Sequence, residues 1–123
     1  SRNYWVGTTS EDGQPHSMPV WATWHDNRLY FSTGEHSRKA RNLRRDPRCT
    51  VTTERADEAV IVEGTAEIET DASVLEAFVA QYKAKYDWAM EPVGIWRVTP
   101  RKAFGFIEHA DQFSTTATRW TFA

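Results

Sequence analysis

Residues 15–47 read PHSMPVWATWHDNRLYFSTGEHSRKARNLRRDP, and this stretch decides the expected fold. Apolar and polar side chains alternate over residues 15–24 and again over 28–33, which is typical of two β-strands. Asp26-Asn27 between them suits a two-residue hairpin turn. After Thr33-Gly34 the sequence predicts a short helix over residues 37–46, which Pro47 ends. We therefore expect a hairpin, a loop and a helix in that order.

The predicted helix is unusually basic. Its apolar residues are only Ala40 and Leu43, and five cations crowd its surface: Arg38, Lys39, Arg41, Arg44 and Arg45. Arg38 and Lys39 fall in the first turn, beside the positive end of the helix dipole, where a cation is unfavourable unless an anion binds. Free N–H groups, the Ser37 hydroxyl and the Lys39 ammonium together form a phosphate cradle. The alternative interpretation is a solvated basic helix, because runs of charge usually face water.

The stretch PHSMPVWATWHDNRLYFSTGEHSRKARNLRRDPR also resembles the core signature of the split β-barrel flavin and deazaflavin oxidoreductases. This superfamily comprises the pyridoxamine-phosphate-oxidase-like proteins. The C-terminal segment TATRWTF is similar to the end of the branch that depends on the deazaflavin coenzyme F-420. The order and spacing of PHSMPVW and SRKARNLRRDPR are more specific than either motif alone. The resemblance spans nearly the whole chain and implies a split barrel with a bound flavin or deazaflavin.

Length, charge and cysteine content limit the class of protein. The chain has 123 residues, a net charge of −2 and one cysteine. This length predicts one domain over residues 1–123. The charge gives no overall basic field for nucleic acid, and a single cysteine fits a reducing cytoplasm. No segment is typical of a transmembrane helix or a signal peptide, so we expect no membrane partner. The resembled family usually has a helix before the first strand, so we expect that an N-terminal segment is missing.

The remaining sequence predicts more strands and a second helix. Strands are expected over residues 3–9, 48–54, 59–70, 94–98, 103–108 and 116–122, the fourth and fifth broken or bent around residues 99–101. Gly64 inside a strand indicates a bulge or a close backbone approach. Asp71 suits the N-cap of an amphipathic helix over residues 72–86. The pattern predicts a mainly β fold, an antiparallel split β-barrel of six or seven strands with two short helices.

The sequence offers few residues for direct chemistry. The histidines lack the spacing of metal ligands: His16, His25, His36 and His109. There is no nucleophile elbow and no Gly-rich phosphate loop, and Cys49 reads as a small core residue. We therefore assign no catalytic residue and no metal, and expect a cofactor to carry any reaction. The proton donor stays unassigned, with His16 and Tyr30 as guesses.

A cofactor site can nevertheless be assigned. The main chain of Val20, Trp21 and Ala22 would lie along the edge of a flat ring. The phosphate would be held by residues of the loop and the helix start: Ser32, Thr33, Ser37, Arg38 and Lys39. Asn42 would support the loop by hydrogen bonding. The resemblance implies the same roles at these positions.

The resemblance also implies a homodimer with a cofactor at each end of the subunit interface. Six tryptophans in so short a chain agree with an interface, because one small core cannot comfortably hold them all: Trp5, Trp21, Trp24, Trp88, Trp96 and Trp120. In such a dimer Trp88, Arg119 and Trp120 would reach a cofactor held mainly by the other chain.

Two cofactors compete for this site. FMN ends in one phosphate, whereas coenzyme F-420 continues through a phosphodiester into an acidic oligoglutamate tail. The five basic residues of the helix, together with Arg119, favour the longer acidic ligand, and we expect Arg44 to matter most for a ligand with that tail. The sequence thus predicts an F-420-dependent reductase that transfers a hydride between the reduced cofactor and a small organic substrate.

Three alternatives remain open from the sequence. Besides the F-420-dependent reductase, the chain could be an FMN-binding, pyridoxamine-phosphate-oxidase-like protein, a non-catalytic cofactor carrier, or a nucleic-acid module that uses tryptophans and the basic helix. The negative net charge and the confinement of basic residues to one helix argue against nucleic acid. The identity of the substrate does not follow from the sequence.

Overall fold

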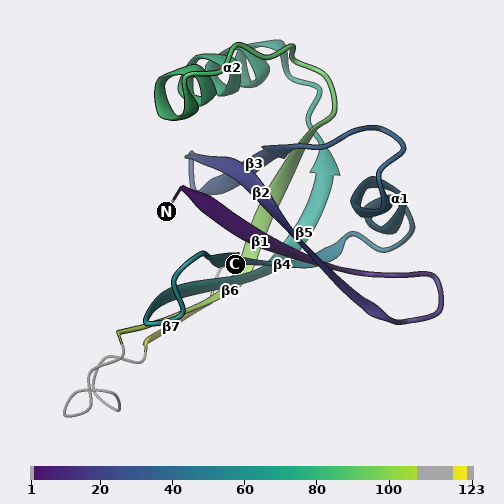
Figure 1. Cartoon of the computed structure of the whole chain (residues 1–123), viewed down its shortest axis with the longest axis vertical. Helices are drawn as coiled ribbons and strands as arrows, with labels where there is room; N and C mark the ends of the chain where they lie inside the picture. Colours follow the sequence, from purple (N-terminus) through teal and green to yellow (C-terminus); the bar gives the residue numbers. More distant parts are fainter. Residues whose placement is uncertain (1, 108–117, 122–123) are drawn as a thin grey trace.

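An antiparallel sheet curls into a barrel, with α2 across one end and α1 at its side (Figure 1). The computed structural model of the chain describes residues 2–107 and 118–121. The elements follow in this order: β1 (Asn3–Thr9), β2 (Pro15–His25), β3 (Arg28–Ser32), α1 (Arg38–Arg45), β4 (Arg48–Thr53), β5 (Glu58–Ile68), α2 (Ala72–Tyr86), β6 (Ile95–Ile107) and β7 (Thr118–Thr121). No helix among the described residues is long and apolar enough to cross a membrane.

Pairing between β3 and β6 closes the barrel. The strand order is β3-β2-β1-β4-β5-β6-β7, and the additional β3–β6 ladder joins the two ends of the first six strands. This ladder runs from the pair Leu29–Val98 to the pair Ser32–Ile95. β7 pairs with β6 outside the closed ring. The expected mainly β, antiparallel split barrel with two helices is therefore confirmed.

Local sequence signals account for the turn and the helix starts. Asp26 and Asn27 have φ values of 54° and 61°, which are the left-handed conformations that a tight β2–β3 hairpin requires. The side chains of Ser37 and Asp71 cap the two helices by accepting backbone N–H groups. The ends of both helices agree closely with the ranges predicted from the sequence.

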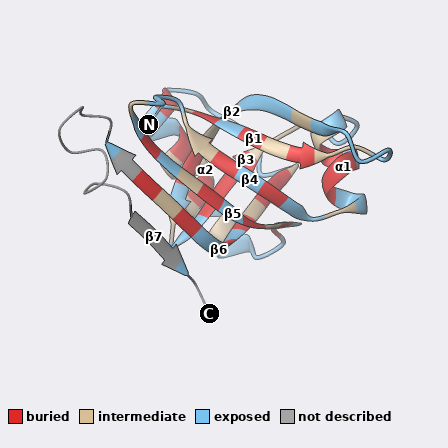
Figure 2. Cartoon of the chain, turned by 90° about the horizontal axis from the view of Figure 1, so that it is seen from below, coloured by how far each residue is buried: buried red, intermediate tan, exposed pale blue. Residues whose placement is uncertain are grey.

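The core consists of two clusters. Inward-facing side chains of the strands fill the barrel, and they include Val6, Ala22, Phe31 and Val98 (Figure 2). Ala40 and Leu43 join this cluster and hold α1 against the barrel wall. The second cluster lies beneath α2 and is rich in aromatic residues: Tyr30, Phe78, Tyr82, Tyr86 and Ile95.

The break expected around residues 99–101 is a bend within one continuous strand. In the β5–β6 ladder Glu63 pairs with Lys102 but Gly64 pairs with Pro100, so β6 carries one extra residue there. The backbones approach closely at this bulge, because a Cβ atom on Gly64 would lie 2.4 Å from the carbonyl oxygen of Thr99. The predicted bulge or close approach at Gly64 is confirmed, and of the two outcomes expected around residues 99–101, a break or a bend, the structure has the bend.

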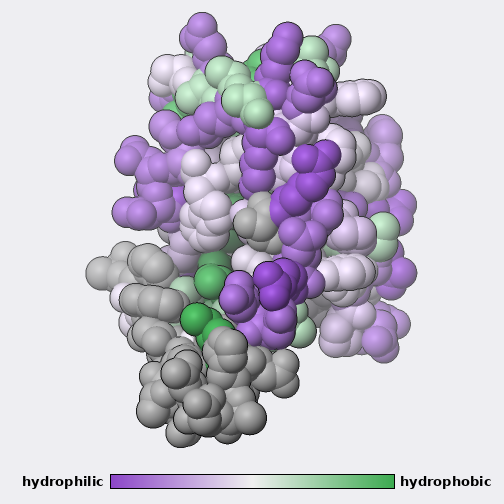
Figure 3. Space-filling view, turned by 60° about the vertical axis from the view of Figure 1, so that its left-hand side comes forward, coloured by the Kyte–Doolittle hydropathy of each residue, from purple (hydrophilic) through white to green (hydrophobic). Residues whose placement is uncertain are grey.

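Several tryptophans lie outside the core. Trp96 is buried, whereas Trp5, Trp24 and Trp88 are exposed by 46%, 43% and 61%. The outer surface in Figure 3 is largely polar, with a smaller apolar area beside the residues drawn in grey. The core therefore holds only part of the aromatic surface, as the sequence indicated.

We predict that Gly64→Ala destabilises the barrel. The added methyl group would collide with backbone at Thr99, so β5 and β6 must move apart, at a cost of about 1–3 kcal/mol. Gly34→Ala is the matched control, because a Cβ atom there meets nothing within 4 Å. Urea denaturation of both variants measures the difference. Equal free energies of unfolding for the two variants would show that the bulge tolerates a side chain at residue 64.

Candidate functional site

The loop between β3 and α1 is held at both ends by backbone hydrogen bonds. The N–H of Thr33 donates to the Gly94 carbonyl at 3.1 Å, and the N–H of Ser37 donates to the Gly34 carbonyl at 3.0 Å. Ser37 Oγ accepts the N–H of Ala40 at 3.1 Å and so caps α1. The start of the helix is thus fixed relative to the barrel.

This helix start retains unused hydrogen-bond donors. Thr33 Oγ1 and Ser37 Oγ are 2.8 Å apart, and since one of the two hydroxyls donates to the other, one O–H remains free. Within the described part of the chain, the backbone N–H groups of Arg38 and Lys39 have no hydrogen-bond acceptor. Two N–H groups and a hydroxyl therefore lie at the start of the helix, and Lys39 adds a cation to the same turn, a combination suited to an anion.

The positive charge at this end of α1 is not compensated by carboxylates. The first turn contains no acidic residue. Lys39 is half-buried, has no ion-pair partner among the described residues, and its pKa is lowered by that burial. An anion at the helix start would remove this unfavourable arrangement, because it would supply the negative charge that the protein does not.

Three arginines of α1 brace the surrounding loops. Arg38 Nη2 donates to Ser10 Oγ at 2.9 Å, and Arg44 Nη2 donates to the Glu35 carbonyl at 2.5 Å. Arg45 Nη2 donates to the Thr9 carbonyl. These contacts fix the loops but leave the charges unpaired, since each acceptor is neutral. These arginines are exposed, so the solvated basic helix stays an alternative for them, whereas Lys39 is half-buried.

His16 on β2 lies close to the same charges. Its Nδ1 atom is buried and has no hydrogen-bond partner among the described residues. Burial lowers the pKa of His16, and the charges of Arg38 and Lys39 lower it further. A bound anion would oppose both charges, so we expect it to favour the protonated imidazole.

Asn42 ties α1 to the neighbouring strand rather than to the loop. It is buried, and its Nδ2 donates to Thr8 Oγ1 of β1 at 3.0 Å. The side chain thus contacts β1 instead of the loop, and a role of Asn42 in supporting the loop stays a prediction. The two partners are 34 positions apart in the sequence, so no local pattern could have predicted this contact.

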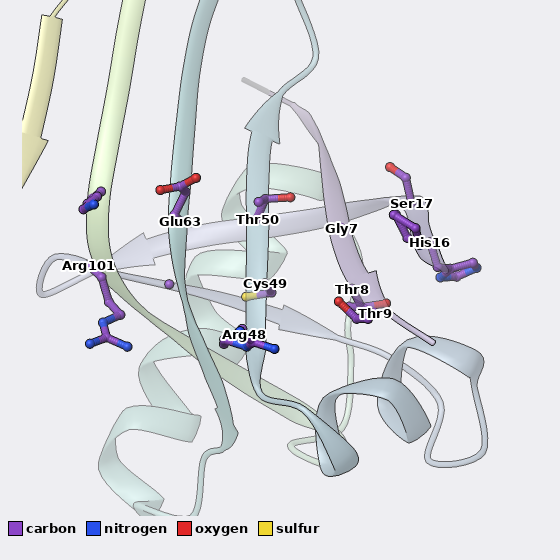
Figure 4. Close-up of a pocket in the computed structure, with 13 residues that line it drawn as sticks. Gly7, Thr8, Thr9, His16, Ser17, Arg48, Cys49, Thr50, Glu63 and Arg101 are labelled. Atoms are coloured by element: carbon purple, nitrogen blue, oxygen red, sulfur yellow. The ribbon is translucent and has the colours of Figure 1, made fainter. Parts of the chain in front are cut away.

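A pocket of about 800 Å³ extends across the outer face of the sheet from this region. Figure 4 shows His16, Thr8 and Thr9 at one end and Arg101 at the other, with β4 and β5 between them. Its lining includes the basic side chains Arg48, Arg101 and Lys102 and the acid Glu63. Sequence reasoning missed this pocket, because five strands contribute to it and no local motif marks it.

The segment expected along the ring edge is engaged by α2. Tyr86 Oη lies 2.9 Å from both the nitrogen and the oxygen of Ala22, and Lys85 Nζ donates to the same oxygen at 2.8 Å. The ring of Trp21 stacks on Tyr86 with centroids 4.5 Å apart. Val20 faces the core. A ring at this position would therefore have to share or replace these contacts.

The other predicted site residues divide into three groups. Ser32, Thr33, Ser37, Arg38 and Lys39 gather where β3 ends and α1 begins. Trp88 is exposed on the loop after α2. Arg119 and Trp120 belong to β7, but their side chains lie outside the described residues.

Tyr30 and Cys49 are poorly placed for acid–base or nucleophilic chemistry. Tyr30 lies in the aromatic cluster beneath α2, where burial raises its pKa. Burial also raises the pKa of the Cys49 thiol to about 12, as expected for a core residue rather than a nucleophile. Within the described part of the chain no group of His, Cys, Asp or Glu could hold a metal ion.

Comparison with known proteins identifies the family. The sequence profile described as pyridoxamine 5'-phosphate oxidase matches residues 1–107. The chain belongs to this family. A search of curated protein sequences finds no match.

Solved structures of similar proteins share the split barrel. A conserved hypothetical protein from Mycobacterium tuberculosis is 29% identical with a TM-score of 0.69, over 84% of this chain and 75% of that one. A protein described as an F-420 reductase is 21% identical with a TM-score of 0.64, over 82% and 87% of the two chains. A heme-binding protein from Mycobacterium smegmatis is 16% identical with a TM-score of 0.73, over 98% and 53%. At such identities the last two show the fold alone.

We predict that Tyr86→Phe destabilises the protein by about 1–3 kcal/mol. Loss of the hydroxyl leaves the N–H of Ala22 and the carbonyl of Arg2, 2.6 Å from Tyr86 Oη, without this partner. Tyr82→Phe is the control, because the Tyr82 hydroxyl has no hydrogen bond within the described residues. Thermal or urea unfolding compares the two. A Tyr86→Phe variant as stable as Tyr82→Phe would contradict this role of Tyr86.

Proposed function

We propose that the protein is an oxidoreductase that binds coenzyme F-420 at the start of α1. The observation that carries this proposal is the half-buried Lys39, which lacks a carboxylate partner and lies beside two unbonded N–H groups. This donor set fits a phosphate or phosphodiester, because such groups accept several hydrogen bonds and carry the missing negative charge. The family match agrees with a phosphorylated flavin-type cofactor, and an F-420 reductase shares the same fold.

The chain's own residues would bind and orient the cofactor. The Thr33 and Ser37 hydroxyls, the first N–H groups of α1 and the Lys39 ammonium would hold the phosphate. When bound, reduced coenzyme F-420 supplies a hydride for an electrophilic carbon or activated double bond of a small organic substrate. No residue is needed as a nucleophile, in agreement with the buried, weakly acidic thiol of Cys49.

The pocket beside His16 favours the longer of the two candidate cofactors. FMN ends at one phosphate, which the helix start alone would accommodate. A phosphodiester that continues into a polyanionic tail needs further basic surface. Arg48, Arg101 and Lys102 line a pocket that also includes His16, which senses the charges of Arg38 and Lys39. Arg48 is paired with Asp46 at 2.7 Å, so Arg101 and Lys102 supply most of the available charge. FMN remains the alternative ligand of the same helix start.

We also propose a homodimer formed through the outer face of the sheet. Pro19, Trp5, Thr52 and Ile61 are successive partners across β2, β1, β4 and β5. Pro19 and Trp5 are exposed, and Ile61 is half-buried. An apolar row of this kind suits burial in an obligate interface, which commonly exceeds about 2,000 Å² in total. Sedimentation should then show a dimer at micromolar concentration, and a monomer would contradict the interface.

Lys39→Ala should weaken binding of the phosphorylated cofactor by about 1.5–3 kcal/mol, because one hydrogen bond to a charged group is lost. The free energy of unfolding should stay nearly unchanged or rise slightly, since an uncompensated cation leaves the first turn. Lys39→Arg should retain part of the affinity. Fluorescence titration with coenzyme F-420 and with FMN provides the measurement. If the wild type binds neither ligand, or if Lys39→Ala binds as tightly as wild type, the proposed site is wrong.

Arg44→Ala distinguishes the two ligands. Arg44 lies in the last turn of α1 and braces the loop through Glu35, so its loss should have a small effect on FMN. A cofactor with an acidic tail should lose more affinity if the tail passes this end of the helix, because its additional charges would then interact with Arg44. Equal losses for both ligands would argue against any contribution of Arg44 to tail binding.

Cofactor affinity should rise as the pH falls toward the lowered pKa of free His16, and His16 should be responsible. In the free protein the pKa of His16 lies below 6.5, and an anion beside Arg38 and Lys39 raises it, so binding takes up a proton. A phosphodiester ligand is the cleaner probe, because the monoester of FMN itself gains a proton near pH 6. His16→Gln should abolish the pH dependence while His36→Gln, at an exposed loop position, keeps it. The same pH dependence in His16→Gln would rule out this role.

A further inference from the structure

The loop from α2 to β6 ends beside the loop between β3 and α1 (residues 33–37), which we call the phosphate-binding loop. The two loops are joined by one backbone contact. Gly94 has a φ of 65°, in the left-handed region, and its carbonyl accepts the Thr33 N–H at 3.1 Å. A Cβ atom on Gly94 would lie 2.6 Å from the Thr33 carbonyl oxygen. Both polar groups of the Thr33 backbone are therefore in close contact with Gly94, and any larger residue must displace them.

Thr33 transmits this contact to the start of α1. Its hydroxyl lies 2.8 Å from Ser37 Oγ, and Ser37 Oγ in turn accepts the N–H of Ala40. The position of Thr33 thus sets the cap of α1, and the cap sets the direction of the free N–H groups of Arg38 and Lys39. A shift at Gly94 reaches the anion-binding donors through only two side chains.

We infer that Gly94 is a positioning residue for the anion site, acting through Thr33 and Ser37 rather than by touching the ligand. This inference rests on the proposed function, because it concerns the same phosphate-binding groups. It also gives the α2–β6 loop a role in that function. Val93, which precedes Gly94 in this loop, is 66% exposed, and Trp88 is 61% exposed. A ligand that contacts these apolar side chains would act on the phosphate-binding end of α1 through Gly94.

Gly94→Ala is the test, with Gly13→Ala as its matched control. Gly13 also has a positive φ, of 86°, so both substitutions introduce similar backbone strain. A Cβ atom on Gly13, however, meets nothing within 4 Å. The two variants therefore separate the cost of a strained alanine from the effect of pushing on Thr33.

The first measurement compares ligands with and without the phosphate. Gly94→Ala should bind coenzyme F-420 about tenfold more weakly, because roughly one charge-assisted hydrogen bond is lost. Its affinity for the deazaflavin chromophore without the phosphate should equal that of the wild type. If the wild type prefers flavin, FMN is the phosphorylated ligand and riboflavin the unphosphorylated one. Gly13→Ala should bind all of them like wild type. Equal weakening of the phosphorylated and unphosphorylated ligands would overturn the inference, because damage to the general fold is not selective for phosphate.

A second measurement does not depend on the cofactor. Amide hydrogen exchange of the free protein should be faster at Ala40 in Gly94→Ala than in wild type or Gly13→Ala, because the Ser37 cap is loosened. Unchanged exchange at Ala40 would overturn the inference even if binding is weaker. If the wild type binds no phosphorylated ligand but exchange at Ala40 increases, the proposed function fails and the coupling of Gly94 to the cap stands.

A double-mutant cycle tests whether Gly94 affects cofactor binding through Thr33. Thr33→Val removes the hydroxyl that contacts Ser37 and should weaken F-420 binding on its own. If Gly94 acts through Thr33, the double variant should bind little worse than Thr33→Val alone. Additive losses would show that Gly94 affects the cofactor by a different route and would contradict the inference.

Discussion

The pairing of β3 with β6 is the constraint on which the site depends. It joins residues 32 and 95, which are distant in the sequence, and so places Thr33 beside Gly94. The same ladder brings Tyr30 and Ile95 into the aromatic cluster through which α2 packs against the barrel. The barrel, the helix at its end and the phosphate-binding loop are thereby held by one set of strand contacts. Without this closure the loop from residue 33 to 37 would be fixed only through α1 and through the pairing of β3 with β2.

The electrostatics of α1 is the second feature on which the proposed function depends. The chain has more acidic than basic residues, 17 against 15, yet the first turn of α1 has no acid and Lys39 has no ion-pair partner among the described residues. The arginines that follow contact neutral oxygens of nearby loops. Their contacts stabilise the loops, while their charges add to the positive field at the site. An anionic cofactor is the simplest partner for such a helix, because its phosphate both accepts the free N–H groups and offsets the charge.

The sequence predicted those features that local patterns determine. Asp26-Asn27 marked the hairpin, Asp71 the start of α2, and Gly64 the bulge that bends β5 against β6. It also singled out the start of α1, since unfavourable first-turn cations are visible without a structure. The sequence could not predict contacts across the barrel. Alternation shows which face of a strand points inward, but not which residues of other elements its side chains contact. The link of Asn42 to Thr8, that of Tyr86 to Ala22 and the pocket beside His16 are all of this kind. The roles expected of Arg119 and Trp120 remain predictions, because their side chains lie outside the described residues.

The crystal structure of the full chain with bound coenzyme F-420 would test the central claim most directly. We predict that the phosphodiester lies at the start of α1, with its oxygens within hydrogen-bond distance of the backbone nitrogens of Arg38 and Lys39 and of Lys39 Nζ. The chain should keep the Thr33–Gly94 hydrogen bond in that complex. A phosphodiester bound elsewhere, for example between Arg101 and Lys102 with the start of α1 facing only water, would contradict the claim that the uncompensated charge of this helix holds the cofactor.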